Sequence, residues 1–355
     1  SCTLGELLAQ KPEKQRGHPM TFVYQREKSS DEEAWLREIQ ERYALVGHRI
    51  AVDDILMTDV WEGAGYWDEP NIEIFSFSIF RAYVEAVRST GATAVLNGSG
   101  GEAVVTSERS VPVHLADLLA SLRLPSFFDQ LLAWRRGLHV PLLNLLIQAV
   151  VLPFLSNRYS LLESKPYEVP EWISPEFSAR MEFQRRATGC WGDLKCRSRD
   201  RQRRLERLYR VSGFLTRGYL EQAALIRYPF LHQPLVEFAL RVPHEYKADP
   251  IESRKLLRHG MADVLPEGLR RRLRQPTGNS PLYYALERQW SSFEPALRDP
   301  ILADLGIIDR SGFEKAMKLA RIGHSTNTVI MLSTLALEIW ARRIFGVETG
   351  KARIA

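Results

Sequence analysis

Three glycines and a carboxylate follow a short apolar run near residue 95. The segment TAVLNGSGGE covers residues 93–102, and its acid is Glu102. Glycine is favoured wherever the backbone needs a positive φ, so a tight turn is one interpretation of residues 98–101. The other is an anion site, in which backbone N–H groups approach a phosphate and Glu102 binds its metal. On their own, these residues leave both interpretations open.

The elements around this segment predict an α/β fold with a parallel sheet. Strand-like runs at 21–25, 48–54 and 93–97 alternate with helical patterns at 30–45 and 77–91. This alternation is typical of parallel strands joined by right-handed crossovers. Ligands of parallel sheets bind at the carboxyl ends of the strands, and NGSGGE lies at such an end. The placement favours a ligand-binding loop over a simple turn.

Beyond residue 112 the pattern is almost entirely helical. A chain of 355 residues is long for one core, so we expect an α/β region over residues 1–112 and a helical region over residues 113–355. The most apolar run, 139–155, is interrupted by prolines and is too short to span a bilayer. We interpret it as a buried helix and expect no membrane partner. The stretch 157–190, rich in Pro, Ser and Glu, predicts an exposed connection.

The charge pattern raises the question of nucleic acid. Two arginine clusters, 197–210 and 269–275, contribute much of the formal net charge of +5. We interpret them as solvated helix faces, because acids are interspersed. The alternative is a basic wall that faces nucleic acid or the phosphates of a nucleotide. Aromatic residues do not interleave with the arginines as they do in single-strand binders, so no nucleic-acid partner is expected.

The cysteines and the first residues indicate the compartment. Three cysteines make no disulfide framework and have no zinc-type spacing. The start of the chain lacks a basic segment followed by an apolar run, so it does not resemble a secretory signal. A reducing, cytoplasmic location is therefore expected.

A second cluster carries a family resemblance. It comprises IRYPFLHQPLVEFALRVPHEYK at 226–247 and SRKLLRHGMADVLPEGLRRRLR at 253–274. Together they resemble the synthetase domain of the asparagine synthetase family, which includes β-lactam synthetases and the macrolactam-forming cyclases of lasso peptides. NGSGGEA resembles that family's S-G-(D/E)-G-(G/S)-D-E loop, and TFVY followed by SSDEE resembles its second nucleotide-binding strand and helix. Three motifs in the family's order are highly specific for the family but weakly specific for the substrate.

The resemblance implies an ATP-pyrophosphatase, Rossmann-like core in the nucleotide-binding region, residues 1–112, and a reaction that uses ATP and Mg²⁺. A substrate carboxylate attacks the α-phosphate, pyrophosphate leaves, and an amine attacks the acyl-adenylate. Such a site must neutralise phosphate charge and exclude water. The implied partners are a small-molecule or peptide carboxylate, with ammonia, glutamine or an amine as nitrogen donor. A homodimer is compatible with this assignment.

Residue roles also follow from the resemblance. Tyr24 matches a position that contacts the adenine, and Asn97 and Gly98 match a Ser-Gly pair that contacts the nucleotide. Glu102 matches an Asp that holds magnesium, for which a carboxylate oxygen is a suitable hard ligand. The expected nucleotide-binding residues are Tyr24, Asn97, Gly98, Ser99, Gly100 and Gly101, the expected magnesium ligand is Glu102, and the expected catalytic cations are Arg254, Lys255 and Arg274.

Several positions depart from the family pattern. Glu102 replaces Asp, Ala103 removes the next acid, and Ser99 occupies a position that is often acidic. Arg274 replaces a lysine and keeps the charge, but it cannot deprotonate. His232 replaces the Asp of P-F-L-D, where we expect it to cap a helix.

The family's phosphate loop, S-G-G-x-D-S, occurs nowhere in the sequence. We therefore expect an amino-terminally truncated chain that is inert alone. The leading interpretation is an asparagine synthase-like ligase that forms amides through an acyl-adenylate. The alternatives are a peptide macrolactam cyclase, which the departures favour somewhat, and a catalytically silent nucleotide-binding or scaffold protein.

Overall fold

Two short parallel ribbons carry the strands of the computed structural model. Strand β1 (Met20–Val23) pairs with β2 (His48–Ala51), and β3 (Ala94–Leu96) pairs with β4 (Leu225–Arg227). The structure describes residues 17–26, 32–65, 67–106, 113–155, 169–182, 196–214, 219–247, 250–252, 254–272, 280–324 and 327–346.

All three expected strands are present and parallel, but they do not form one sheet among the described residues. β3 pairs with β4, which comes from the segment just before the YPFL motif, and not with β2. β4 has only three residues, and its sequence, LIR, carries too little period-two pattern to be recognised alone. The fold is α/β, whereas the expected Rossmann-like core stays a prediction.

The expected helices between the strands are also present. Helix α2 (Glu33–Tyr43) connects β1 to β2, and α4 (Phe77–Ser89) precedes β3. Gly91 ends the second connection with a φ of +68°, a left-handed conformation that glycine adopts without strain. Ile39 and Tyr43 of α2 pack against residues 264–269 of the second family motif.

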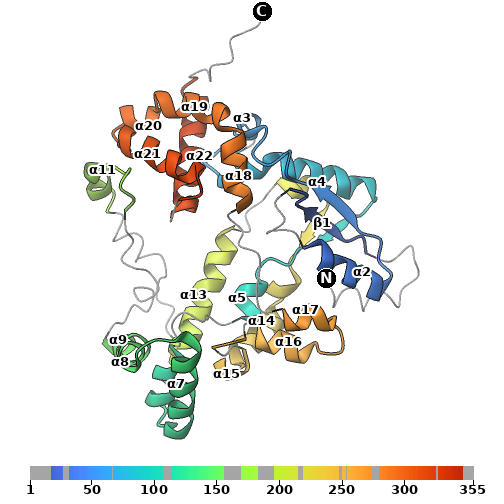
Figure 1. The fold of residues 1–355 in the computed structure, drawn as a ribbon, viewed down its shortest axis with the longest axis vertical. Helices are drawn as coiled ribbons and strands as arrows, with labels where there is room; N and C mark the ends of the chain where they lie inside the picture. The colour runs from blue at the N-terminus through green and yellow to red at the C-terminus, as the bar shows by residue number, and fades with distance from the viewer. Residues whose placement is uncertain are drawn as a thin grey trace, which may run out of the picture.

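The main core lies between the loop that follows β2 and the carboxyl-terminal helices (Figure 1). Phe75 meets Phe293 edge to face, with ring centroids 6.2 Å apart. The helices on this side are α3 (Val60–Gly63), the 3₁₀ helix Ile72–Ser76, α18 (Ser280–Arg288), α19 (Trp290–Arg298), α20 (Ile301–Asp304), α21 (Arg310–Arg321) and α22 (Thr328–Ile344).

Trp172 joins this main core from a segment that was expected to be an exposed connection. Its side chain is buried, and its indole N–H donates to the Thr334 hydroxyl at 3.2 Å. The short helix α11 (Pro175–Arg180) follows it. The prediction is therefore wrong around Trp172, while residues 157–168 and 183–190 lie outside the described residues.

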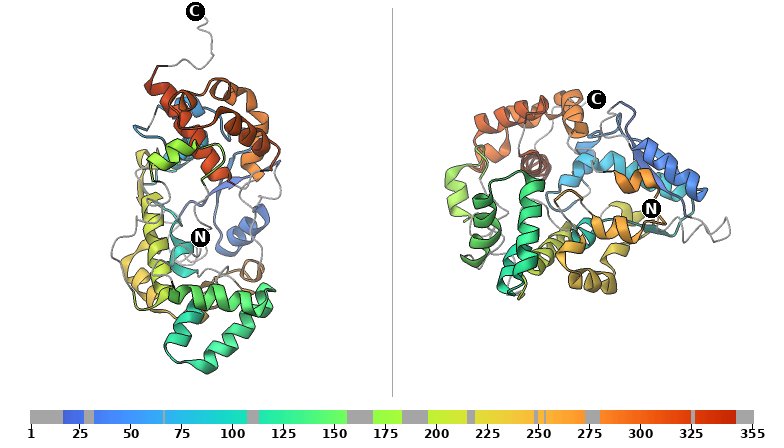
Figure 2. Two further views of the ribbon diagram at one scale, coloured as in Figure 1. Left: turned by 90° about the vertical axis from the view of Figure 1, so that its left-hand side faces the viewer. Right: turned by 60° about the horizontal axis from the view of Figure 1, so that its bottom comes forward.

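A second core lies at the opposite end of the molecule (Figures 1 and 2). It joins α6 (His114–Ala120) and α7 (Leu124–Leu138) to a helical run formed by α8 (Leu142–Leu146), a π-helical turn (Ile147–Val151) and α9 (Leu152–Leu155).

The helical run 142–155 is buried on one side only. Leu145 and Ala149 are buried, whereas Leu143, Ile147 and Val151 are exposed. The run packs against α6 and α7 through Leu145, Ala149 and Val150. The expectation of a buried helix is therefore wrong for its outer face. Within the described residues, no helix is both long and apolar enough to cross a membrane.

The long helix α13 (Arg199–Phe214) runs between these two ends, and the elements of the family motifs gather beside it (Figure 1). The loop helix α5 (Gly101–Val105) contacts both α13 and α14. The remaining elements here are the 3₁₀ helices Tyr219–Gln222 and Pro229–Leu231, α14 (Gln233–Arg241), α15 (His244–Lys247), α16 (Lys255–Gly260) and α17 (Glu267–Arg271).

Candidate functional site

The glycine loop and the YPFL motif leave the same end of one parallel ribbon. The Asn97 N–H continues the β3–β4 ladder and donates to the Arg227 carbonyl at 2.8 Å. NGSGGE therefore follows β3 at the point where YPFL follows β4. Two motifs that are far apart in sequence become neighbours at the carboxyl ends of two strands, where ligands of parallel sheets bind.

The glycines of the loop serve two different needs. Gly100 has a φ of +87°, and a Cβ there would lie 2.5 Å from the Leu231 side chain. A Cβ on Gly101 would lie 3.2 Å from the Phe230 ring. Gly100 is therefore required for the turn, and Gly101 permits close packing against YPFL. A Cβ on Gly98 would meet nothing within 4 Å, so its backbone is open to the approach of a ligand.

Asn97 and Ser99 shape the loop from within. The Asn97 side-chain oxygen accepts hydrogen bonds from the Ser99 backbone N–H at 2.8 Å and from its hydroxyl at 2.7 Å. This is the local pattern by which asparagine stabilises a turn two residues ahead. Ser99 is exposed, so the hydroxyl that stands at an often acidic position of the family pattern lies on the outside of the loop.

Glu102 points away from the apolar side of α5. Val104 and Val105 are buried against α13 and α14 in a small apolar cluster, and Ala103 is 1% exposed. The Glu102 side chain is 61% exposed and forms an ion pair with Arg254. The structure thus brings together the expected magnesium ligand and one of the expected catalytic cations.

A single carboxylate at this place is compatible with magnesium. Mg²⁺ is commonly held by one or two carboxylates together with substrate phosphates and water, so Glu102 is a suitable ligand although Ala103 offers none. Among the described residues, no group of three or more His, Cys, Asp or Glu side chains could hold a metal ion.

Arg254 belongs to a cluster of guanidinium groups. It precedes α16 with a φ of +58°, and burial lowers its pKa, as do the nearby charges of Arg258 and Arg272. Arg258 is buried and donates to the Arg272 carbonyl at 2.5 Å, which fixes the end of α17. Arg272 in turn pairs with Glu32, before α2, at 2.7 Å. Arg254, which the resemblance implies near the phosphates, therefore lies beside two further guanidinium groups.

The other predicted cations have different outcomes. Lys255 is the first residue of α16, directly after Arg254, and its side chain is half-buried. Arg274 lies outside the described residues. His232 does precede helix α14, but its side chain makes no capping hydrogen bond, so that expectation is wrong.

Tyr24 follows β1 and therefore lies at the end of the other ribbon. Its ring packs against the main core, and burial raises the pKa of its hydroxyl, as does the nearby Asp53 carboxylate. Asp53 is buried and accepts hydrogen bonds from the backbone N–H groups of Gln25 at 2.7 Å and Arg26 at 3.2 Å. Asp53 therefore holds the chain that leaves β1, next to Tyr24.

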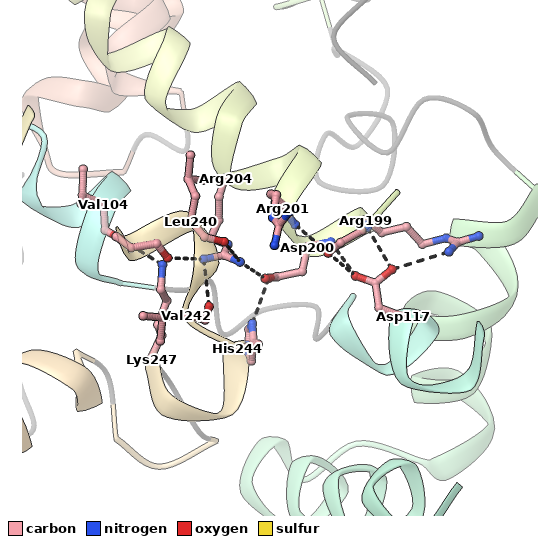
Figure 3. Close-up of polar contacts among 12 residues, drawn as sticks. Val104, Asp117, Arg199, Asp200, Arg201, Arg204, Leu240, Val242, His244 and Lys247 are labelled. Carbon is pink, nitrogen blue, oxygen red and sulfur yellow. Dashed lines mark hydrogen bonds and ion pairs between the residues drawn. The ribbon is translucent and has the colours of Figure 1, made fainter. Parts of the chain in front are cut away.

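Part of the arginine cluster of α13 belongs to a buried polar network (Figure 3), so the interpretation as a solvated face is wrong for Arg203 and Arg204, whereas Arg201 is exposed. Asp200 pairs with Arg204 at 2.9 Å and accepts from His244 at 2.9 Å. Burial by itself raises the pKa of Asp200, but the His244 hydrogen bond and the Arg204 charge outweigh it and lower the pKa. Arg204 also donates to the Ala239 carbonyl at 2.8 Å, near the end of α14.

One more histidine contact and a helix cap complete this region. His114 of α6 stacks on His244 with ring centroids 3.9 Å apart. Burial lowers the pKa of His114 well below the usual value, and the charge of His244 contributes to the shift. Asp117 of α6 accepts from the backbone N–H groups of Arg199 at 2.9 Å and Asp200 at 3.0 Å. A side chain of α6 therefore caps the amino end of α13.

Lys247 is the residue here that sequence reasoning missed. Its side chain is 0% exposed, and its ammonium donates to the Val104 carbonyl of α5 at 3.2 Å (Figure 3). Burial lowers its pKa to about 7, and the Arg204 charge contributes to the shift. The lysine lies inside the second family motif, but nothing in the string VPHEYK indicates that its side chain is buried.

The fold and this geometry define an α/β protein in which the glycine loop at the end of the β3–β4 ribbon forms an ion pair with Arg254, directly before α16. The sequence pattern of the family described as asparagine synthase matches residues 2–342. The chain therefore belongs to the asparagine synthase family, whose members are ligase-type enzymes, and the resemblance is confirmed. A search among curated proteins found no match to the chain.

Proposed function

We propose that this protein is an ATP-dependent carbon–nitrogen ligase that forms an amide through an acyl-adenylate. The observation that carries the proposal is the ion pair between Glu102 and Arg254. It joins the two segments for which the family pattern implies magnesium and phosphate contacts. The open backbone at Gly98, at the end of β3, lies in the same loop as Glu102.

In this proposal the charges of the site divide between metal and phosphate. Glu102 would hold Mg²⁺ together with phosphate oxygens, and the ion would neutralise charge on the leaving pyrophosphate. Arg254 and Lys255 would bind phosphate oxygens. Arg254 would then donate to phosphate oxygens instead of to the Glu102 carboxylate. Tyr24, beside Asp53, would contact the adenine, and Arg274 would lie near the adenylate.

The carboxylate substrate can be aspartate or the carboxyl group of a peptide. Departures at Ser99, Ala103 and Arg274 support a specialised member, and Ala103 is buried in the apolar side of α5. The loop thus offers one carboxylate, from Glu102, where the family pattern S-G-(D/E)-G-(G/S)-D-E ends in two acids. A peptide macrolactam cyclase is therefore the second candidate.

The test is ATP-to-AMP turnover with pyrophosphate release by the full-length protein, with aspartate plus ammonia or glutamine. We expect Glu102→Gln to reduce turnover by about 100-fold, because a neutral amide is a poor magnesium ligand. Glu237→Gln is the matched control, since Glu237 is also a half-exposed helical glutamate paired with an arginine, Arg241.

The outcomes separate the candidates. Turnover that needs aspartate and is lost in Glu102→Gln supports an asparagine synthase reaction. ATP binding without turnover on aspartate supports a peptide carboxylate, which release of pyrophosphate with a peptide acid would establish. Equal turnover in the two variants would contradict the role of Glu102.

A further inference from the structure

A fully buried lysine contacts the short helix that carries Glu102, and the proposed reaction does not use it. The Lys247 ammonium lies 3.2 Å from the Val104 carbonyl, two residues after Glu102 (Figure 3). Placing an ammonium in a protein interior is unfavourable unless it gains a specific partner. The partner here is the backbone of α5.

The bond acts on a backbone group that has no partner inside the helix. Helix α5 has only five residues, so the Val104 carbonyl is among the last four and lacks an intrahelical donor. Lysine side chains near a helix end can satisfy such carbonyls. Within the described part of the chain, the side-chain packing of this helix end is apolar, from Val104 and Val105 against α13 and α14. Lys247 thus supplies a directional contact that the apolar cluster cannot.

Lys247 is itself held in place by α13. Asp200 accepts from His244 at 2.9 Å, which ties the first residue of α15 to α13. Arg204 pairs with Asp200 and donates to the carbonyls of Ala239 at 2.8 Å and Val242 at 3.4 Å, just before α15. Lys247 is the last residue of this short helix. A continuous series of polar contacts therefore runs from α13 through α15 to α5.

We propose that Lys247 is a positioning residue for the glycine loop, which it holds by its bond to the Val104 carbonyl so that Glu102 faces Arg254. The role of Glu102 in this statement rests on the proposed function. The contact between Lys247 and α5 does not.

The protonation of Lys247 gives this role a signature in pH. The charged groups that act on it are Arg204 and Asp200 of α13. Asp200 also accepts from His244, the first residue of α15. The Lys247 pKa of about 7, lowered by burial, means that the ammonium becomes an amine around neutral pH. A neutral amine makes a weaker hydrogen bond than an ammonium, so the local contact that holds α5 weakens as the pH rises. The free energy of unfolding of the whole protein changes in the opposite direction, because loss of the buried charge favours the folded chain.

The first experiment measures amide hydrogen exchange in α5, residues 101–105, and does not depend on activity. We expect exchange about tenfold faster in Lys247→Met than in the wild type, because a charged hydrogen bond is lost. Helix α22 serves as the internal reference for global stability. Lys318→Met, which removes an exposed lysine paired with Glu314 on α21, is the matched control and should leave α5 unchanged.

Unchanged exchange in α5 of a folded Lys247→Met variant would overturn the proposal. If that variant does not fold, the wild type decides: exchange in α5, corrected for its intrinsic rate, should rise between pH 6 and pH 8. Exchange that follows only the intrinsic rate over this range would overturn the proposal equally.

The second experiment measures the affinity of the full-length protein for ATP with Mg²⁺ between pH 6 and pH 8.5. We expect the wild-type affinity to fall about fivefold through neutral pH as the ammonium is lost. Lys247→Met should bind weakly at all pH values, and Lys247→Arg should recover affinity without the pH dependence. Equal pH profiles in all three would contradict positioning through Lys247. A wild type that binds no ATP at any pH contradicts the proposed function instead, and hydrogen exchange then decides the role of Lys247.

Discussion

At the scale of single residues, the loop depends on which glycine is replaced. Gly100 has a left-handed backbone, and Leu231 occupies the space of a side chain, whereas Gly98 has open space around it. An added methyl group would therefore clash with Leu231 at Gly100 but would meet no protein atom at Gly98. The turn depends on Gly100, whereas Gly98 leaves room for the proposed ligand, although the two glycines look equivalent in the string GSGG.

We expect Gly100→Ala to reduce the free energy of unfolding by about 2 kcal/mol, through backbone strain and the contact with Leu231. Gly98→Ala should change it by less than about 0.5 kcal/mol. In contrast, Gly98→Ala should weaken ATP binding severalfold, because a methyl group would occupy the space of a phosphate. Chemical denaturation and ATP titration of both variants test this, and a Gly98→Ala variant with unchanged affinity would contradict a phosphate contact there.

At the scale of secondary-structure elements, α13 is defined at its start by another helix. Asp117 of α6 accepts from two backbone N–H groups at the amino end of α13 and from the Ser198 hydroxyl at 2.8 Å. Its carboxylate also lies 3.5 Å from the Arg199 guanidinium. The second core is thereby joined to the helix that supports α14 and α15.

We expect Asp117→Ala to lower the free energy of unfolding by about 2 kcal/mol, since it leaves helix-end N–H groups without their acceptor. Asp129→Ala, on the exposed side of α7, is the control and should change it by less than about 0.5 kcal/mol. Thermal or chemical denaturation measures both. Similar losses in the two variants would show that the cap does not stabilise α13.

At the scale of the whole molecule, a buried cation makes stability depend on pH. The pKa of Lys247 is about 7 in the folded protein against 10.5 for an ordinary lysine. Between these values the unfolded chain binds one more proton than the folded chain. The contribution of Lys247 to the free energy of unfolding therefore rises with pH over this window and is lost as the pH falls toward 7.

We expect the difference in unfolding free energy between the wild type and Lys247→Met to increase by roughly 1.4 kcal/mol per pH unit above pH 7. Denaturant unfolding at pH 7, 8 and 9 measures it. A difference that is constant with pH would mean that the lysine is not buried as an amine in the folded protein.

Much of the candidate site could be predicted from the sequence, because its components are local strings. NGSGGE alone left a turn and an anion site open, and its position after a strand together with the YPFL and SRKLLR segments favoured the site. The structure places NGSGGE and YPFL at one ribbon end and joins Glu102 to Arg254. The strands β1, β2 and β3 followed from short apolar runs in alternation with helices. The roles of Tyr24, Lys255 and the glycine loop in binding stay predictions.

What the sequence by itself determined is the family, the parallel α/β character of the amino-terminal region and the residues of the loop. Each depends on neighbours within a few positions. The tertiary structure alone decided that β4 pairs with β3, that Arg203 and Arg204 of α13 are buried and that Lys247 reaches α5. These features depend on contacts between segments 35 or more residues apart. The residues next to a polar side chain in the sequence do not indicate which face of its helix is covered or which backbone group the side chain contacts there.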